Sequence, residues 1–294
     1  MDAYDIAFVG HVSTDQITSF EGQTLCYTGG SAFFSAMAAT ATSKKIALIT
    51  KMFEADRPLL DPVKAAGIDT FLIPASQTTR MQVIHSTSNV DEREMFQPRS
   101  AGFIAITDMP LIESAWVHFA GLTDQDFTIE VMRHTRQRGC RLSVDMQSFV
   151  RQVDPVTRKI SFRDVPQKIE ILKLVETVKV DSVEAQILTG NNDLEKAASQ
   201  FEQWGCEETI ITRSDGVLAR HKGKTCFESF SNRNIAGRTG RGDTVFGAYL
   251  SRRLDHGVAE SLKFAAALAS IKMEHPGPFT GSPAEVLERI RNFH

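Results

Sequence analysis

The sequence predicts one α/β domain over residues 1–294, built on a mostly parallel β-sheet with helices on both faces. Short apolar runs alternate with segments of helical periodicity, as they do where parallel strands are buried between two layers of helices. Polar residues follow several of these runs, at the edge where an open α/β sheet binds its ligands. With 294 residues, 42% of them hydrophobic, the chain can bury a large core without disulfide or metal support.

Three strands are expected in the first half of the chain, at residues 6–9, 46–49 and 115–119. Each is a brief, nearly unbroken apolar run, too short for a helix and bounded by glycine, small polar or charged residues. A helix rich in small residues is expected over 32–40, after a pair of glycines. The order strand, helix, strand is typical of a parallel sheet.

The second half continues the alternation with a helix over 128–137 and strands at 141–144, 177–180 and 209–212. Another helix is expected to end at Gly190. The polar residues at the strand ends indicate a ligand crevice, although each can equally be a helix cap or a turn residue.

Two segments interrupt this alternation, at about 11–28 and 71–98. The first has loop-like alternating sequence, the second resembles a β-hairpin, and neither contains a helix pattern of its own. We therefore expect a small lid of β-strands over the crevice, because such lids exclude water from a reaction. The lid strands can pair across a homodimer, or the protein can be a monomer.

Charge and cysteine content exclude several classes of protein. The 33 Lys and Arg residues against 36 Asp and Glu give a net charge of −3, so we expect neither nucleic acid nor an anionic membrane as a partner. The four cysteines form no C-x-x-C pair, which argues against a zinc ribbon. The acidic N-terminus lacks the features of a signal peptide and no apolar run is long enough to span a membrane, so we expect a cytoplasmic protein.

The most informative segment is 234–250, where Gly237, Gly240 and Gly242 precede apolar residues at helical spacing. Such a loop directs backbone N–H groups at an anion beside a helix N-terminus. Asp243 would lie in the first helical turn, where a carboxylate can accept a hydroxyl proton as a phosphoryl group is transferred. The alternative is an ordinary glycine-rich turn in which Asp243 only complements the helix dipole.

This segment resembles the C-terminal signature of the ribokinase-like (PfkB) family of carbohydrate kinases, and the sequence is similar to inositol-kinase-like members. Further landmarks occur in the family's order along nearly the whole chain. They are Asp15, the Gly29-Gly30 pair, Asp145 to Gln147 with Arg151, Asp181 with Glu184, Thr212 to Gly216, and Ala265–Gly277. The resemblance implies a three-layer Rossmann-type fold and a kinase that uses ATP and Mg²⁺ on a small sugar, cyclitol or nucleoside.

The family also implies a role for each matched residue. Asp243 would be the catalytic base, and Gly240, Arg241 and Gly242 would form the anion hole. Substrate would be bound by Asp15, Gly29, Gly30, Phe34 and Gln147. The nucleotide would be bound by Asp181, Glu184, Thr212, Arg213 and Gly216, with Asp181 and Glu184 holding Mg²⁺ through water, and Ala265–Gly277 would close the adenine pocket.

Some positions depart from the family pattern. Gly237 replaces an acidic residue that commonly helps hold a monovalent cation, which puts that cation in doubt. Our hypothesis is that Arg238, Arg241 or both take over its electrostatic role, although both side chains can equally point to solvent. Ser214 replaces a glycine of the nucleotide turn. Phe34 replaces a hydrogen-bonding asparagine, which favours a cyclitol or nucleoside over a pentose, unless Phe34 is simply a core residue.

Other functions remain as alternatives. A catalytically silent sugar- or nucleotide-binding protein on the same fold is compatible with the altered positions. A nicotinamide-dependent oxidoreductase fits the strand pattern, but the glycine fingerprint is absent after the first strand. Gly223-Lys224-Thr225 resembles the end of a P-loop but is expected to be a hairpin turn. His11, close to Asp15 in the sequence, is a weaker candidate for the site.

Overall fold

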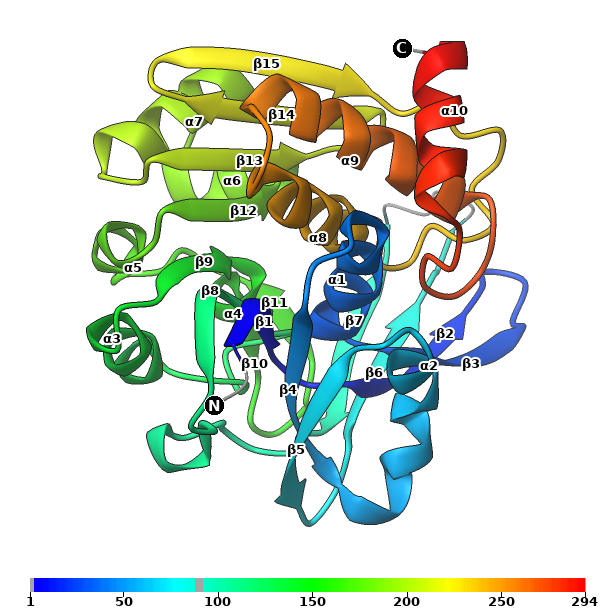
Figure 1. Ribbon diagram of the computed structural model, residues 1–294. Coiled ribbons are helices and arrows are strands. Elements are labelled where there is room, and N and C mark those ends of the chain that lie inside the picture. Colours follow the sequence, from blue (N-terminus) through cyan, green and yellow to red (C-terminus); the bar gives the residue numbers. More distant parts are fainter. Residues whose placement is uncertain (1–2, 88–91, 294) are drawn as a thin grey trace.

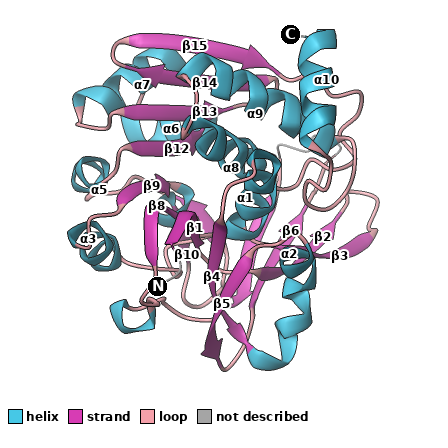
Figure 2. Cartoon of the chain, viewed as in Figure 1, coloured by secondary structure: helices cyan, strands magenta, loops and turns pink. Residues whose placement is uncertain are grey.

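A nine-stranded sheet between two layers of helices forms the body of the protein, as predicted (Figures 1 and 2). The structure, a computed structural model, describes residues 3–87 and 92–293. The strand order is β15-β14-β13-β12-β9-β8-β1-β4-β5, and the seven strands from β13 to β5 run parallel. At one edge of the sheet, β14 pairs in antiparallel fashion with both β13 and β15.

All six expected strands lie in this sheet, extended by one to four residues. The strands of the sheet are β1 (Ala3–Val9), β4 (Ile46–Phe53), β5 (Asp69–Ala75), β8 (Glu113–Phe119), β9 (Arg141–Asp145), β12 (Thr177–Asp181), β13 (Glu208–Thr212), β14 (Gly216–His221) and β15 (Lys224–Ser229). The Gly223-Lys224-Thr225 segment lies at the β14–β15 connection, as expected for a hairpin turn.

The helices, four of which were expected, complete the domain. They are α1 (Ser31–Ala39), α2 (Asp61–Ala65), α3 (Ile129–Gln137), α4 (Gln147–Val150), α5 (Lys168–Leu174), α6 (Ser182–Thr189), α7 (Leu194–Gln203), α8 (Arg241–Arg253), α9 (Val258–Met273) and α10 (Pro283–Phe293). Among the described residues, no helix is both long and apolar enough to cross a membrane.

The alternation of side chains along β1 shows how one strand serves two cores. Ile6 and Phe8 pack into the cluster formed with α1, α8 and α9, whereas Ala7 and Val9 pack into the cluster formed with α3, α5, α6 and α7. All four side chains are fully buried. A parallel strand covered on both faces must be apolar at every position, which is why these runs lack the polar alternation of a half-exposed strand.

A second, four-stranded sheet forms the lid, with the order β3-β2-β6-β7. Its strands are β2 (Ser13–Thr18), β3 (Thr24–Gly29), β6 (Thr79–Ile84) and β7 (Glu94–Arg99); a separate hairpin joins β10 (Arg151–Val153) to β11 (Ile160–Phe162).

The predicted extent of the lid needs one correction. Residues 71–75, placed in the lid by the sequence, belong to β5 and pair in parallel with β4 in the main sheet. The sequence favoured a hairpin because β5 lies at an edge and is only partly buried, so its pattern resembles a lid strand. Residues 88–91, within the predicted 71–98 segment, lie outside the described residues.

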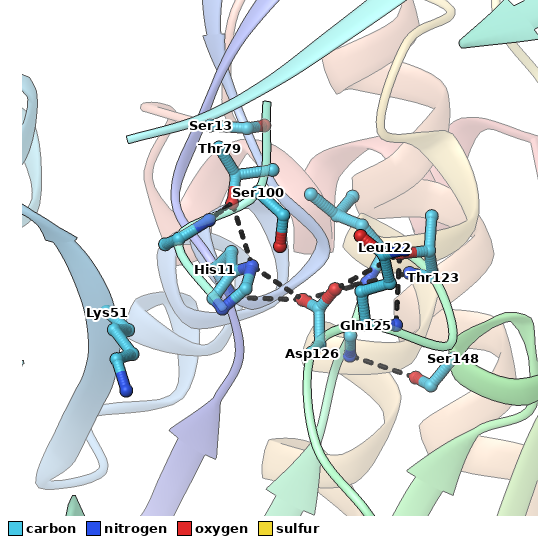
Figure 3. A network of polar contacts seen from close by, with 12 residues as sticks. His11, Ser13, Lys51, Thr79, Ser100, Leu122, Thr123, Gln125, Asp126 and Ser148 are labelled. Atoms are coloured by element: carbon cyan, nitrogen blue, oxygen red, sulfur yellow. Dashed lines mark hydrogen bonds and ion pairs between the residues drawn. The ribbon is translucent and has the colours of Figure 1, made fainter. Parts of the chain in front are cut away.

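His11 lies at the junction between the two sheets, in the connection from β1 to the lid (Figure 3). It is fully buried; its Nδ1 lies 2.9 Å from the Thr79 hydroxyl and 3.4 Å from Asp126 Oδ2, and its Nε2 lies 3.0 Å from the Gly102 carbonyl oxygen. Thr79 begins β6 and Gly102 follows β7. The imidazole of His11 therefore links the β1–β2 connection to the start of β6 and to the segment after β7. His11 therefore holds the base of the lid and does not line the cavity described below.

The close approach of α1 and α8 depends on Gly247. A methyl group at this position would lie 2.0 Å from the Ser35 carbonyl oxygen of α1, so the two backbones are in direct contact. Glycine is conformationally costly inside a helix and is retained here because only it allows this approach.

We expect Gly247→Ala to lower the free energy of unfolding by about 2 kcal/mol or more, although the same change stabilises an exposed helix. Gly257→Ala is the matched control, because nothing lies within 4 Å of its added methyl group, and it should cost less than about 1 kcal/mol. Urea unfolding measures both. Equal stability of the two variants would contradict the proposed close packing.

Candidate active site

One cavity of about 290 Å³ lies between the main sheet, the lid and the start of α8. It contains more basic than acidic groups. Its charged lining residues are Arg93, Arg151, Lys179, Arg238 and Arg241 on the basic side and Asp15, Asp181 and Asp243 on the acidic side. Two of the five cations, Lys179 and Arg151, are paired with the buried carboxylates Asp145 and Glu184. Five basic side chains along one cavity nevertheless favour an anionic ligand, although the whole chain is slightly acidic.

Asp243 lies in the first turn of α8 and is held by α1. The Ser31 hydroxyl donates to Asp243 Oδ1 at 2.7 Å, and the Ser35 hydroxyl donates to the Asp243 backbone carbonyl at 3.0 Å. Both serines are buried, whereas Asp243 itself is partly exposed to the cavity. The carboxylate is thereby oriented while its other oxygen can meet a substrate group.

The loop that leads into α8 turns at Gly240, the N-cap residue, with a φ of 78°. A side chain there is excluded twice, by the left-handed backbone and by the Phe34 ring, which would lie 2.5 Å from an added methyl group. On the other side, a methyl group at Gly242 would lie 3.2 Å from the Lys179 ammonium. The first amides of α8 therefore face a cavity with a buried cation close by, which is the arrangement that binds anions.

The Lys179 ammonium donates to Asp145 Oδ2 at 2.7 Å, and both side chains are buried. Burial alone would lower the pKa of Lys179, but the carboxylates of Asp145, Asp243 and Glu184 outweigh it and raise the pKa above its ordinary range. Lys179 therefore stays protonated beneath the helix N-terminus. Asp145 also accepts a hydrogen bond from the Gln147 backbone amide at 3.1 Å.

Asp181 and Glu184 form a reciprocal cap at the start of α6. The Glu184 amide donates to Asp181 Oδ1 at 2.8 Å, and the Asp181 amide donates to Glu184 Oε2 at 2.9 Å. Glu184 is fully buried and meets Arg151 at 3.3 Å, whereas Asp181 lines the cavity. With both Glu184 oxygens engaged, and with no cluster of three metal-binding side chains among the described residues, this donor set fits only a Mg²⁺ ion held mainly by phosphate and water.

Asp15 projects from β2 of the lid into the cavity. Its Oδ1 accepts a hydrogen bond from the Ser13 hydroxyl at 2.6 Å, and its carboxyl group packs so closely on Gly29 that no side chain fits there. Burial raises the pKa of Asp15 from 3.8 to about 6, and the charge of Asp243 adds to the increase.

The structure brings most of the predicted site residues together. Those that line the cavity are Asp15, Gly30, Phe34, Gln147, Asp181, Thr212, Gly240, Arg241, Gly242 and Asp243. Gly29 and Glu184 lie directly behind the wall, in contact with Asp15 and Asp181.

Two predicted nucleotide-binding residues are placed elsewhere. The Arg213 side chain is exposed and pairs with Asp215, and Gly216 packs against the backbone of β15. Neither belongs to the cavity, nor does any described residue of 265–277, where the adenine pocket was expected.

Sequence reasoning missed Lys179 and the lid residues that face the cavity, such as Val83 and Met95. Lys179 had a readable signal, since a single lysine inside the apolar run 177–180 must be paired if the strand is buried. Val83 and Met95 could not be assigned, because no local pattern states which face of a lid turns inward.

The parallel sheet, the strand-built lid and the cationic cavity at the start of α8 define a ribokinase-like α/β protein. The chain matches the pfkB family of carbohydrate kinases over residues 4–285 and belongs to that family. Its kinase relatives include the cytidine kinase of Thermococcus kodakarensis, 26% identical over 257 residues that cover 84% of this chain and 87% of the relative.

Two similar solved structures are pyrophosphate-dependent kinases of the ribokinase family, each 31% identical to this chain. One, solved with sulfate, has a TM-score of 0.89 and covers 97% of this chain and 99% of its own. The other, complexed with a pyrophosphate analogue and myo-inositol, has a TM-score of 0.88 and covers 96% and 99%. Their similarity to this chain extends through both the main sheet and the lid.

The raised pKa of Asp15 generates a pH prediction. As pH falls through about 6 the carboxylate is protonated. If a hydroxyl group of the substrate that receives the phosphoryl group (the acceptor) binds Asp15, its charge-assisted hydrogen bond to the carboxylate then weakens. We expect the KM for the acceptor to rise about 10-fold between pH 7.5 and 5, and to be flat over that range in Asp15→Asn.

The same variant should unfold at an equal or higher temperature at pH 7, because a carboxylate whose pKa is raised on folding disfavours the folded state once it is ionised. Initial rates with varied acceptor and thermal unfolding measure the two effects. An unchanged rise in KM in Asp15→Asn would assign the titration to another group.

Proposed function

We propose that this protein is a kinase that transfers a phosphoryl group from inorganic pyrophosphate to a hydroxyl group of a cyclitol such as inositol. The observation that carries the proposal is the position of Asp243, a serine-bound carboxylate in the first turn of a glycine-led helix within a cationic cavity. Membership of the pfkB family supports a kinase.

In the proposed reaction, Asp243 accepts the proton of the acceptor hydroxyl as its oxygen attacks the terminal phosphorus. The new O–P bond forms while the bond from phosphorus to the leaving oxygen breaks, and phosphate departs with that electron pair. The amides of Gly240, Arg241 and Gly242 stabilise the charge on the transferring group, and Lys179 adds a fixed positive charge beneath them. This chemistry requires positioning and charge, both of which the cavity supplies.

Pyrophosphate as the donor is supported by the shape of the cavity around Arg241. The Arg241 guanidinium lies 5.6 Å above the Phe230 ring and donates to the Ser214 carbonyl at 3.4 Å, so it crosses from α8 to the β13–β14 turn. Of the residues expected to bind a nucleotide, Asp181 and Thr212 line the cavity, whereas Arg213, Gly216 and residues 265–277, where the adenine pocket was expected, do not. ATP, which the sequence favoured, remains the second candidate donor.

A cyclitol as the acceptor is supported by the mixture of apolar and hydrogen-bonding side chains on the lid side of the cavity. The lid contributes the apolar side chains of Ile17, Met81, Val83 and Met95, while Asp15 supplies a hydroxyl acceptor among them. A ring with apolar C–H faces and hydroxyl groups at its rim fits this combination. The related kinase solved with myo-inositol supports the same class.

Mg²⁺ would neutralise charge on the donor phosphates when bound. Asp181 would hold it through water, and Glu184 would orient Asp181 through their reciprocal hydrogen bonds. Arg151, paired with Glu184, keeps the second carboxylate fixed.

Removal of the base tests the reaction itself. We expect Asp243→Asn to lower kcat by about 100-fold or more with folding intact, when phosphoryl transfer from pyrophosphate or ATP is measured over cyclitols, sugars and nucleosides. Asp255→Asn, an exposed carboxylate near the other end of α8, is the matched control and should retain activity. Turnover at the wild-type rate in Asp243→Asn would exclude it as the base. Absence of turnover in the wild type with every donor and acceptor would favour the silent binding protein.

A pair of arginine variants tests the donor. Arg241→Ala should raise the KM for pyrophosphate about 10-fold or more, because a charge-assisted contact to phosphate is lost. Arg213→Ala should leave it unchanged, since Arg213 faces away from the cavity. A preference for ATP in the wild type, together with a raised ATP KM in Arg213→Ala, would overturn pyrophosphate as the donor.

A further inference from the structure

Lys272 is a buried lysine that the reaction described above does not use. It lies in the last turn of α9 and is 2% exposed. Its ammonium donates to the backbone carbonyls of Gly237 and Thr239, in the loop that leads to Gly240. A lysine is almost never buried without such partners, so this one has a specific task.

The contacts of Lys272 connect three parts of the site. Its Nζ lies 5.0 Å from the centroid of the Phe34 ring, and that ring packs beneath Gly240. The Gly237 amide in turn donates to the Met273 carbonyl at 2.7 Å, so the loop is also held by the residue that follows the lysine at the end of α9. The ammonium thus lies under the turn that aims the first amides of α8.

The charge of Lys272 persists at neutral pH. Burial lowers its pKa to about 8, and the neighbouring carboxylate of Asp243 works against the decrease. A positive charge therefore lies beside both the base and the loop in the working protein.

A monovalent metal cation bound in this loop would use the same two backbone carbonyl oxygens, those of Gly237 and Thr239, as ligands. Here both carbonyls already bind the ammonium, so the loop does not fit an added metal cation at this point. This differs from our hypothesis that Arg238 or Arg241 takes that role, since both arginines line the cavity, whereas the ammonium that binds the two carbonyls is that of Lys272.

We infer that Lys272 is a positioning residue whose ammonium serves as a built-in monovalent cation, holding the 237–242 loop so that its amides face the transferring phosphoryl group. The inference rests on the proposed kinase activity but on neither the donor nor the acceptor assigned to it. It implies that turnover needs no added potassium.

The first experiment uses the unmodified protein. Turnover is measured at constant ionic strength in potassium, sodium, ammonium and choline chlorides. We expect rates equal within about twofold. Activation by potassium of more than about 10-fold over choline would overturn the inference, because the loop would then require a metal cation.

The second experiment removes the charge. Lys272→Met keeps the length of the side chain, and we expect kcat to fall about 100-fold with a much smaller change in the acceptor KM. Ammonium or potassium should raise the kcat of this variant at least about 10-fold, whereas choline should not. Lys196→Met, an exposed lysine on α7, is the control and should remain insensitive to all salts.

A direct binding measurement separates this inference from the proposed function. Titration calorimetry is done with inorganic pyrophosphate and, separately, with ATP. Whichever donor binds the wild type should bind more weakly to Lys272→Met, with recovery in ammonium chloride, even if no acceptor is turned over. Lys272→Gln serves the same purpose should the methionine variant fail to fold, since it keeps a donor to the two carbonyls but no charge. Full kcat and unchanged donor affinity in a folded neutral variant would refute the role of Lys272.

Discussion

The contact between α1 and the first turn of α8 is the constraint on which the rest of the site depends. Gly247 lets the two helix backbones touch, and the hydroxyl groups of Ser31 and Ser35 then reach Asp243. That contact sets the direction of α8, and with it the direction of the amides that face the cavity. Phe34, on the same α1 helix, supports Gly240 from below. One helix pair thus fixes both Asp243, the proposed base, and the loop that we propose binds the anion.

Buried charge is the second feature of the site, and it is arranged in pairs. Lys179 binds Asp145, Arg151 binds Glu184, and Lys272 binds two backbone carbonyls. Isolated charges would be costly inside the domain, whereas these pairs keep cations in place next to the cavity in which we propose that a phosphate donor binds. The arrangement favours function over stability, because well-packed apolar groups of the same volume would stabilise the fold at least as well.

The sequence predicted the strands of the main sheet well, and the reasons are local. Apolar runs such as 6–9 are unambiguous because both faces of the strand are buried. The edge strand β5 was misplaced because its half-buried pattern resembles a lid strand. Arg213 and Gly216 follow Thr212, which lines the cavity, but they do not line it themselves, because the direction of a side chain beyond a strand end is not encoded in spacing.

By itself the sequence determined the α/β class, the order of elements and the glycine-led helix that carries Asp243, because hydrophobic periodicity and glycine positions act over a few residues. Only the tertiary structure decided which cations meet at the cavity. Lys272 lies 29 residues or more from every member of the 234–243 segment that it supports through Gly237 and Thr239. Its role arises from the packing of α9 against the loop, since a buried ammonium binds whichever carbonyls the fold brings within reach.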